Sequence, residues 1–149
     1  MGTYELERVG SEFLDQAPVR FEMSVRIDAP ASAVWAAMED AETWPRGAKA
    51  HKRDEWTSAP PFGVGTTRTV TMTNGKTTYY EEFFTWEPRR LMEFRINQST
   101  TPGVSAMAEL RHRDGLEPAL PTGAGNAGRR LESFSEPLGD HHRDEVWEA

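Results

Sequence analysis

Hydrophobic and polar residues alternate through the middle of the chain, over residues 65–98, in a pattern that predicts three antiparallel strands. Val70 and Met72 are separated by threonines in the first run, and apolar positions alternate with polar ones across residues 92–96 in the last. A period of two places successive side chains on opposite faces of a strand. One face of the predicted sheet is therefore apolar and has to be covered.

Two turn signals divide this region. Asn74-Gly75, between runs of β-branched and aromatic residues, predicts a two-residue type I′ hairpin, in which both central residues need positive φ. The segment 87–90, Glu-Pro-Arg-Arg, turns the chain again. The sequence therefore predicts a three-stranded meander.

A strand followed by a short helix is predicted before the meander. Residues 19–28 alternate between apolar and polar and predict a strand with one buried face. Asp28 is a candidate cap for a helix over residues 31–40. Pro45 prevents one long helix, so we expect a break and then a second short helix or loop. A further strand is expected over residues 54–58.

Composition excludes several classes of function. The chain has 149 residues and a net charge of −7, which gives no electrostatic support for a nucleic-acid partner. No apolar run is long enough to span a membrane and no signal-peptide pattern is present, so we expect a cytoplasmic protein. The absence of cysteine excludes disulfides and thiolate catalysis, and the histidines do not cluster, so we expect no cofactor and no metal.

The composition changes abruptly at about residue 110. Prolines and glycines recur from there to residue 128 and interrupt any regular element, and residues 129–149 are rich in charge. We therefore divide the chain into an N-terminal arm over residues 1–18, a folded domain over residues 19–109, and a divergent, irregular tail over residues 110–149.

The order of these elements carries a family resemblance. The residues that carry the resemblance are Ile27-Asp28-Ala29-Pro30 with Val34-Trp35, Trp44-Pro45, Phe62-Gly63-Val64-Gly65-Thr66, Glu87-Pro88-Arg89-Arg90 and Met92-Glu93-Phe94-Arg95-Ile96. The chain resembles the SRPBCC superfamily, also called START-like or Bet v 1-like, and within it the polyketide cyclase/dehydrase and lipid-transport group. The resemblance implies an α+β helix-grip fold, in which a curved antiparallel sheet wraps around a long C-terminal helix and leaves a hydrophobic cavity. Some relatives are cyclases or dehydratases, and many only bind or carry apolar ligands.

The tail departs from the family pattern, which expects two more strands and a long amphipathic helix, so we expect the C-terminal helix to be incomplete. One possible choice of codons for residues 110–115 encodes a different peptide when the reading frame is shifted by one base. That peptide, Tyr-Val-Ile-Glu-Thr, has the pattern of a β-strand. This raises the hypothesis that the tail is a frameshifted translation; a natural, divergent tail is the alternative. A sheet without its closing helix exposes an apolar face, which favours self-association.

Aromatic and methionine side chains are candidates for lining the cavity, because they suit a mixed apolar ligand surface. Plain core packing is the alternative for each of them. The candidate ligand-binding residues are Trp35, Met38, Trp44, Phe62, Val70, Met72, Phe84, Met92, Phe94, Ile96 and Met107.

Charged residues on the same strands are candidates for catalysis. By alternation Arg68 shares a face with Val70, and Glu82 shares one with Tyr80. If these faces point inward, the charges lie in an apolar cavity, where they must pair or contact a ligand. Arg68, Tyr80 and Glu82 are then candidates to orient a substrate carboxylate or phenolate, or to transfer protons. Glu81 and Glu82 are adjacent, so only one points inward, and the sequence leaves open which; an outward charge is the alternative.

Three functional hypotheses follow. The first is binding or transport of a hydrophobic small molecule, lipid or polyketide-like, on the concave face of the sheet. The second is a polyketide cyclase or dehydratase that uses general acid and base residues in that cavity. The third is a truncated, non-functional domain whose tail does not close the fold.

Overall fold

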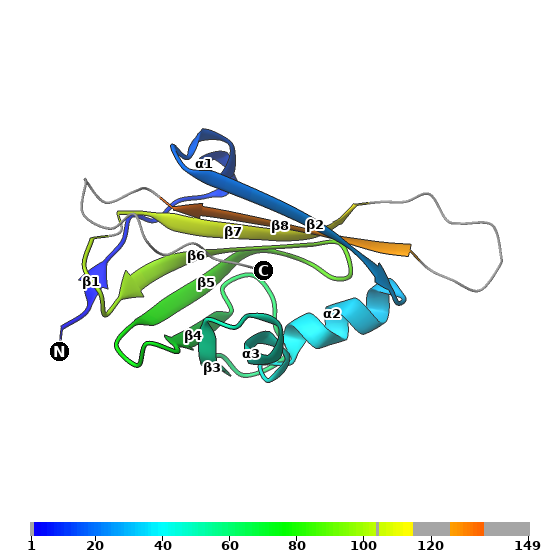
Figure 1. The fold of residues 1–149 in the computed structure, drawn as a ribbon, viewed down its shortest axis with the longest axis horizontal. Coiled ribbons are helices and arrows are strands. Elements are labelled where there is room, and N and C mark those ends of the chain that lie inside the picture. The colour runs from blue at the N-terminus through cyan, green and yellow to red at the C-terminus, as the bar shows by residue number, and fades with distance from the viewer. Residues whose placement is uncertain (1, 104, 115–125, 136–149) are drawn as a thin grey trace.

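The computed structural model describes the backbone of residues 2–103, 105–114 and 126–135, and their side chains outside residues 20–26 and 109–135 (Figure 1). Helices and strands follow one another as a mixed α+β chain. In order they are β1 Tyr4–Glu5, α1 Ser11–Gln16, β2 Arg20–Asp28, α2 Ala31–Glu39, α3 Thr43–Gly47, β3 His51–Trp56, β4 Thr67–Met72, β5 Thr78–Glu87, β6 Leu91–Ser99, β7 Met107–Asp114 and β8 Asn126–Ser135.

The described strands form one antiparallel sheet. Its order is β2-β8-β7-β6-β5-β4-β3, and β1 pairs with the end of β6 that β7 leaves open. The predicted meander is β4-β5-β6, and the predicted α+β helix-grip class is confirmed. The expectation that the C-terminal helix is incomplete falls partly on residues 136–149, which lie outside the described residues.

The turn between β4 and β5 differs from the predicted type I′ hairpin. Gly75 has φ of +69°, whereas Asn74 is not among the described residues with positive φ. The side chain of Asn74 instead accepts hydrogen bonds from the backbone N–H groups of Lys76 and Thr77, both at 2.9 Å. An asparagine can close a turn through its own carboxamide, so the loop is longer than two residues. Asp28 is similarly not the predicted cap, because Pro30 precedes α2 and no side-chain cap bond forms.

Two β-bulges reset the alternation of side chains along β5 and β6. The pairing of β5 with β6 shifts between Tyr80 and Glu81, and again between Phe83 and Thr85. A bulge places two residues opposite one and leaves a residue out of the ladder. Phe83 and Trp86, which simple alternation places on opposite faces, therefore share one face of the sheet, and Phe84 lies on the other.

Different helices cover the two faces of the sheet (Figure 1). We call the face under α2 and α3 the inner face, and the face under α1 the outer face. Two separate hydrophobic cores fill them. The inner core contains Trp35, Met38, Trp44, Phe83, Met92 and Phe94, with Trp56 and Trp86 packed against it. The outer core contains Val9, Leu14, Ala106 and Ala108, with Phe13, Ala17 and Phe84 packed against it.

The predicted N-terminal arm is part of the outer layer. Leu6 and Leu14 are both buried. The Leu6 N–H donates to the Asn97 carbonyl at 2.8 Å, and the Glu7 N–H donates to the Ser105 carbonyl at 2.7 Å. Burial of these two leucines and the backbone hydrogen bonds together hold the arm on the sheet.

The tail predicted to be irregular supplies strands instead. β7 continues to Asp114 between β6 and β8, and β8 pairs with β2 along its length. The prediction is wrong for these two ranges because a β-ladder is made by backbone groups, which residues rich in Arg and His also provide. The proline- and glycine-rich residues 115–125 lie outside the described residues.

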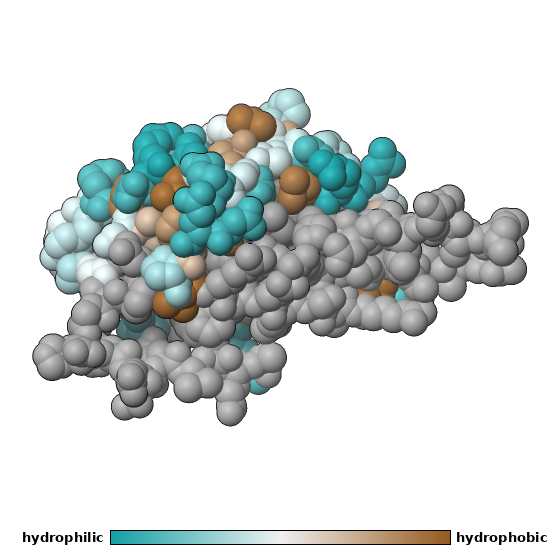
Figure 2. Space-filling view, turned by 90° about the horizontal axis from the view of Figure 1, so that it is seen from above, coloured by the Kyte–Doolittle hydropathy of each residue, from teal (hydrophilic) through white to brown (hydrophobic). Residues whose placement is uncertain are grey.

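A large uncovered apolar face is not found in the described part of the chain. Such a face was expected for a sheet without its closing helix, but Val70, Met72, Phe94 and Ile96 on the predicted meander are all buried. In Figure 2 the described residues show hydrophobic spots separated by hydrophilic ones. Over the same residues, no helix combines the length and apolar character needed to cross a bilayer.

Candidate functional site

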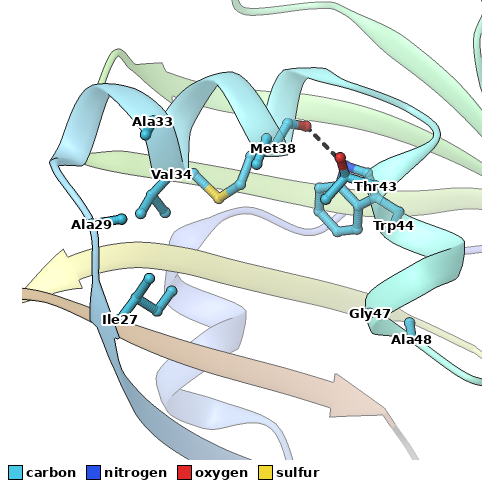
Figure 3. A pocket seen from close by; sticks show the side chains of 10 residues that line it. Ile27, Ala29, Ala33, Val34, Met38, Thr43, Trp44, Gly47 and Ala48 are labelled. Atoms are coloured by element: carbon cyan, nitrogen blue, oxygen red, sulfur yellow. Dashed lines mark hydrogen bonds between the residues drawn. The ribbon is translucent and has the colours of Figure 1, made fainter.

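An open apolar pocket lies beside the inner core, between the end of β2 and helices α2 and α3 (Figure 3). Its volume is about 290 Å³. The residues that line it are Ile27, Ala29, Ala33, Val34, Ala37, Met38, Thr43, Trp44, Gly47 and Ala48. Thr43 contributes the one side-chain hydroxyl of this lining, so the walls offer mostly hydrocarbon to an occupant.

Small residues leave this space open. Ala33 and Ala37 lie four residues apart, and therefore on one side of α2, together with Val34 and Met38. Gly47 in α3 adds no side chain, and a Cβ placed there would meet no atom within 4 Å. Helix α2 is short and rich in alanine, a composition that suits close packing against a neighbouring element. In the structure its alanines form a wall of the pocket instead.

Trp44 forms the wall between the pocket and the interior of the sheet. Its indole N–H donates to the Met38 carbonyl at 2.8 Å, the contact drawn in Figure 3. Its ring lies 3.8 Å from Cζ of Arg68 and meets Phe94 edge-on, with centroids 6.3 Å apart. One side chain therefore faces an apolar space on one side and a buried guanidinium on the other.

Behind Trp44 lies a set of four polar residues, His51, Asp54, Arg68 and Glu81, which we call the buried ion cluster. Arg68 Nε donates to Glu81 Oε2 at 2.8 Å, and Nη2 bonds to the same oxygen. Arg68 Nη1 lies 3.6 Å from Asp54 Oδ2, and Asp54 Oδ1 lies 3.0 Å from His51 Nδ1. The side chains of Arg68 and Asp54 are 0% exposed, and that of Glu81 is 5% exposed.

Charge balance explains how these ions tolerate burial. A buried charge is expensive unless it is paired and hydrogen-bonded. One guanidinium faces two carboxylates, and its face rests on aromatic rings that attract cations. Nη1 of Arg68 has no hydrogen-bond partner among the described residues.

Glu82 belongs to a different set of contacts on the outer face. Its carboxylate accepts hydrogen bonds from Asn97 at 2.6 Å and Arg95 at 3.0 Å, and pairs with Arg8 at 2.5 Å. Burial acts to raise the pKa of Glu82, but the Asn97 hydrogen bond and the charges of Arg95 and Arg8 outweigh it and hold that pKa below its ordinary value. Glu82 is thus an ionised anchor for the N-terminal arm.

The three candidate catalytic residues are not brought together. Arg68 lies on the inner face, whereas Tyr80, opposite Thr69 in the ladder, lies with Glu82 on the outer face. Glu81, directly opposite Arg68, takes the inward position that the sequence left open. Alternation alone places Glu82 with Trp86, but the bulge after Phe83 separates them.

Two of the candidate ligand-binding residues, Met38 and Trp44, line the pocket. Most of the others pack inside the protein. Trp35, Met92 and Phe94 fill the inner core; Val70, Met72 and Ile96 are buried; Phe62 stacks on Trp56 with centroids 4.6 Å apart; Met107 is half-buried on β7; and Phe84 packs in the outer core.

Sequence reasoning missed both the small residues of the pocket and two members of the ion cluster. Ala33, Ala37 and Gly47 carry no chemistry, and their signal is their spacing on one helix face. His51 and Asp54 stand in a run of charged residues, a pattern that usually lies in solvent. In the part of the chain that the structure describes, no three His, Asp or Glu side chains gather as a metal site.

Comparison with known proteins gives consistent matches. Residues 18–120 match a family model described as polyketide cyclase/dehydrase and lipid transport, which extends past the composition change at residue 110. An uncharacterized protein of Mycobacterium tuberculosis is 41% identical over 106 residues, as is one of Mycobacterium bovis. The match covers 71% of this chain and 63% of each relative, so the chain spans less than two thirds of their length.

Solved structures share the fold at low identity. A START superfamily protein of Mycobacterium smegmatis superposes with a TM-score of 0.62 and 11% identity, covering 83% of this chain and 81% of that one. The Zhui aromatase/cyclase of a Streptomyces species superposes with a TM-score of 0.61 and 18% identity, covering 81% and 70%. Sequence identities this low show only that the fold is shared.

Proposed function

We propose that this chain, which belongs to the polyketide cyclase/dehydrase and lipid transport family, binds an apolar small molecule in the pocket between β2, α2 and α3. The observation that carries the proposal is the pocket itself, an open space with mostly apolar walls beside the packed inner core. Exposed concave apolar surface is the usual mark of a small-molecule site.

The dimensions of the pocket suit a small or slender ligand. A volume of about 290 Å³ lies near the lower end of the roughly 300–1,000 Å³ typical of ligand pockets. Burial of hydrocarbon against Ile27, Val34 and Met38 supplies affinity at roughly 25 cal/mol per Å². Thr43 and the Trp44 ring offer the polar and aromatic contacts that orient a ligand.

A cyclase or dehydratase activity is the second candidate, and the buried ion cluster favours it. The His51–Asp54 pair offers groups that can transfer protons, and Arg68, paired with Glu81, offers a fixed positive charge. Trp44 stands between these pairs and the pocket, so a substrate reaches them only past that ring. Binding without chemistry needs no such movement, and we therefore rank it first.

Matched tryptophan substitutions on α2 test the pocket. Ala37 lines the pocket, whereas Ala36, its neighbour, is exposed and does not. A neutral fluorescent probe, N-phenyl-naphthylamine, is titrated into the wild type, Ala37→Trp and Ala36→Trp, and its emission is followed. We expect the wild type and Ala36→Trp to bind alike, and Ala37→Trp, whose indole fills the space, to lose about tenfold or more in affinity. Equal binding by all three proteins would sink the proposal.

A further inference from the structure

The N-terminal arm is a feature of this chain that the family match does not cover. Residues 2–17 of the arm precede residues 18–120, which match the family model. The arm lies on the outer face of the sheet, whereas the pocket lies on the inner face, under α2 and α3 (Figure 1). Strand β1 pairs with the end of β6, and α1 contacts β7 and β8. A property that resides in the arm is therefore independent of the pocket.

Ser11, the first residue of α1, ties the arm to the sheet through its hydroxyl. Ser11 Oγ donates a hydrogen bond to Glu93 Oε2 on β6 at 2.8 Å. The serine is exposed, whereas Glu93 is 4% exposed. Hydrogen bonds to an ionised acceptor are stronger than those between neutral groups. A chemical change at Ser11 Oγ therefore acts directly on a buried carboxylate.

The residues before Ser11 have the charge pattern of a substrate for arginine-directed serine/threonine kinases, which recognise an arginine three residues before the acceptor hydroxyl. Arg8 holds that position, and its side chain is 62% exposed. Thr71 and Ser133 also follow an arginine at this spacing. Thr71 lies in β4 between β3 and β5, and Ser133 lies in β8 between β2 and β7. Strands paired on both sides hold those two residues, so Ser11 is the accessible one of the three.

We propose that Ser11 is a phosphorylation site, and that phosphorylation releases the N-terminal arm from the outer face of the sheet. The kinase transfers the γ-phosphoryl group of ATP to Ser11 Oγ: the bond from phosphorus to the ADP oxygen breaks, a bond to Oγ forms, and the hydroxyl proton passes to the catalytic base of the kinase. Oγ then has no proton to donate to Glu93. It carries instead a group of charge about −1.5 to −2, and a phosphate beside a glutamate disrupts packing by repulsion.

Arg8 couples recognition by the kinase to release of the arm. In the closed arm its guanidinium lies 2.5 Å from Glu82 Oε2. A kinase that binds Arg8 takes it from Glu82 and so acts on the open arm. Once Ser11 is phosphorylated, repulsion at Glu93 opposes closure and shifts the population toward the open state. Opening exposes Leu14, which the closed arm buries.

Mapping of the phosphate tests the site. The full chain is incubated with Mg-ATP and the catalytic subunit of cyclic-AMP-dependent protein kinase, which is arginine-directed, and the modified residue is identified by tandem mass spectrometry. We expect phosphate on Ser11 in the wild type and its loss in Arg8→Gln. Arg46→Gln is the matched control, because Arg46 is also an exposed arginine paired with a glutamate, and it should be modified like the wild type. A wild type without phosphate on Ser11 overturns the proposal.

Hydrogen–deuterium exchange of backbone amides tests the release. The Leu6 N–H donates to the Asn97 carbonyl and the Glu7 N–H to the Ser105 carbonyl, so their exchange reports on closure of the arm. Phosphorylated wild type should exchange these amides faster than the unmodified protein by about tenfold or more. Ser11→Ala loses the hydrogen bond without gaining charge and should show a smaller increase. Equal exchange in the phosphorylated and unmodified proteins contradicts release.

A substitution at Glu93 separates the charge of the phosphate from its bulk. Phosphorylated Glu93→Gln has no carboxylate to repel the phosphate, so phosphorylation should accelerate exchange less than in the wild type. Acceleration of equal size would assign release to bulk and overturn the electrostatic cause. The comparison of phosphorylated with unmodified wild type needs no substitution, so it decides the question of release even if Glu93→Gln does not fold. Failure of any of these tests leaves the proposed function intact, because the pocket lies on the other face.

Discussion

Adjacent glutamates on β5 serve different parts of this molecule. Glu81 points inward and pairs with Arg68, whereas Glu82 points outward to Arg95 and the N-terminal arm. Their roles are set by the pleat of one strand, because successive side chains leave it on opposite faces. The pairing partners decide which glutamate points inward: Arg68 lies directly opposite Glu81 in the ladder.

Removing the charge of Arg68 should destabilise the fold. Arg68→Met removes the guanidinium that Glu81 and Asp54 both face, and breaking a buried ion pair costs about 3–5 kcal/mol. Urea unfolding followed by tryptophan fluorescence measures the loss. Arg90→Met is the control, since Arg90 and its partner Glu87 are exposed, and it should change the free energy of unfolding by less than about 0.5 kcal/mol. Similar losses in the two variants would contradict this account of the cluster.

The contribution of Glu82 should depend on pH. Its folded-state pKa lies below the ordinary value of 4.5, so folding favours the ionised carboxylate. That stabilisation is complete above pH 4.5 and is lost as the pH falls through the lower folded-state pKa. Glu82→Gln should therefore be less stable than the wild type at neutral pH, by about 0.5–1 kcal/mol.

The difference between the two proteins should shrink once the pH falls below 4.5. Thermal unfolding of both proteins over a series of pH values measures the gap. A gap that stays constant down the series would show that Glu82 acts through its shape and not through its charge.

The elements of the chain were more predictable than the details of how they join. Alternation and turn residues predicted β2, β4, β5 and β6, and α2 was expected over nearly its observed range. Those patterns are local, and each depends on a few neighbouring residues. A bulge depends on the partner strand, so the reset after Phe83, which turns Trp86 to the inner face, had no sequence signal.

The candidate site was predicted only in part, for a related reason. Arg68, Met38 and Trp44 stand out by residue type, and the structure brings them to one place. Half of the residues that line the pocket are alanine or glycine, and their contribution is the volume that they leave empty. Empty volume depends on how α2 and α3 sit on the sheet, which the pattern of a single sequence does not encode.

Helix α1 should matter for stability and not for binding. Leu14 is 3% exposed in the outer core, so Leu14→Ala should cost about 2–4 kcal/mol of unfolding free energy. The pocket lies under α2 and α3 on the inner face, so the affinity for N-phenyl-naphthylamine should be unchanged where the variant is folded. Gln16→Ala, at an exposed position of the same helix, is the control. Weaker probe binding by folded Leu14→Ala would show that the two faces are coupled.

At the scale of the whole molecule, one sheet separates two layers with different tasks. The outer layer is a packed core in which the Glu82 carboxylate anchors the N-terminal arm. The inner layer holds a pocket beside the buried ion cluster. Family membership and the shared START-like fold fit this division. The hypothesis that residues 110–149 result from a frameshift stays a prediction, which the sequence of the gene tests.

Native mass spectrometry of the protein purified from the cells that make it tests the central claim most directly. Wild type and Ala37→Trp are sprayed under the same conditions, with Ala36→Trp as the control. We predict that the wild type and Ala36→Trp carry an additional mass that organic solvent extracts, and that Ala37→Trp lacks it. The same additional mass on all three proteins would place any ligand outside this pocket, and its absence from all three would contradict a stably bound cellular ligand.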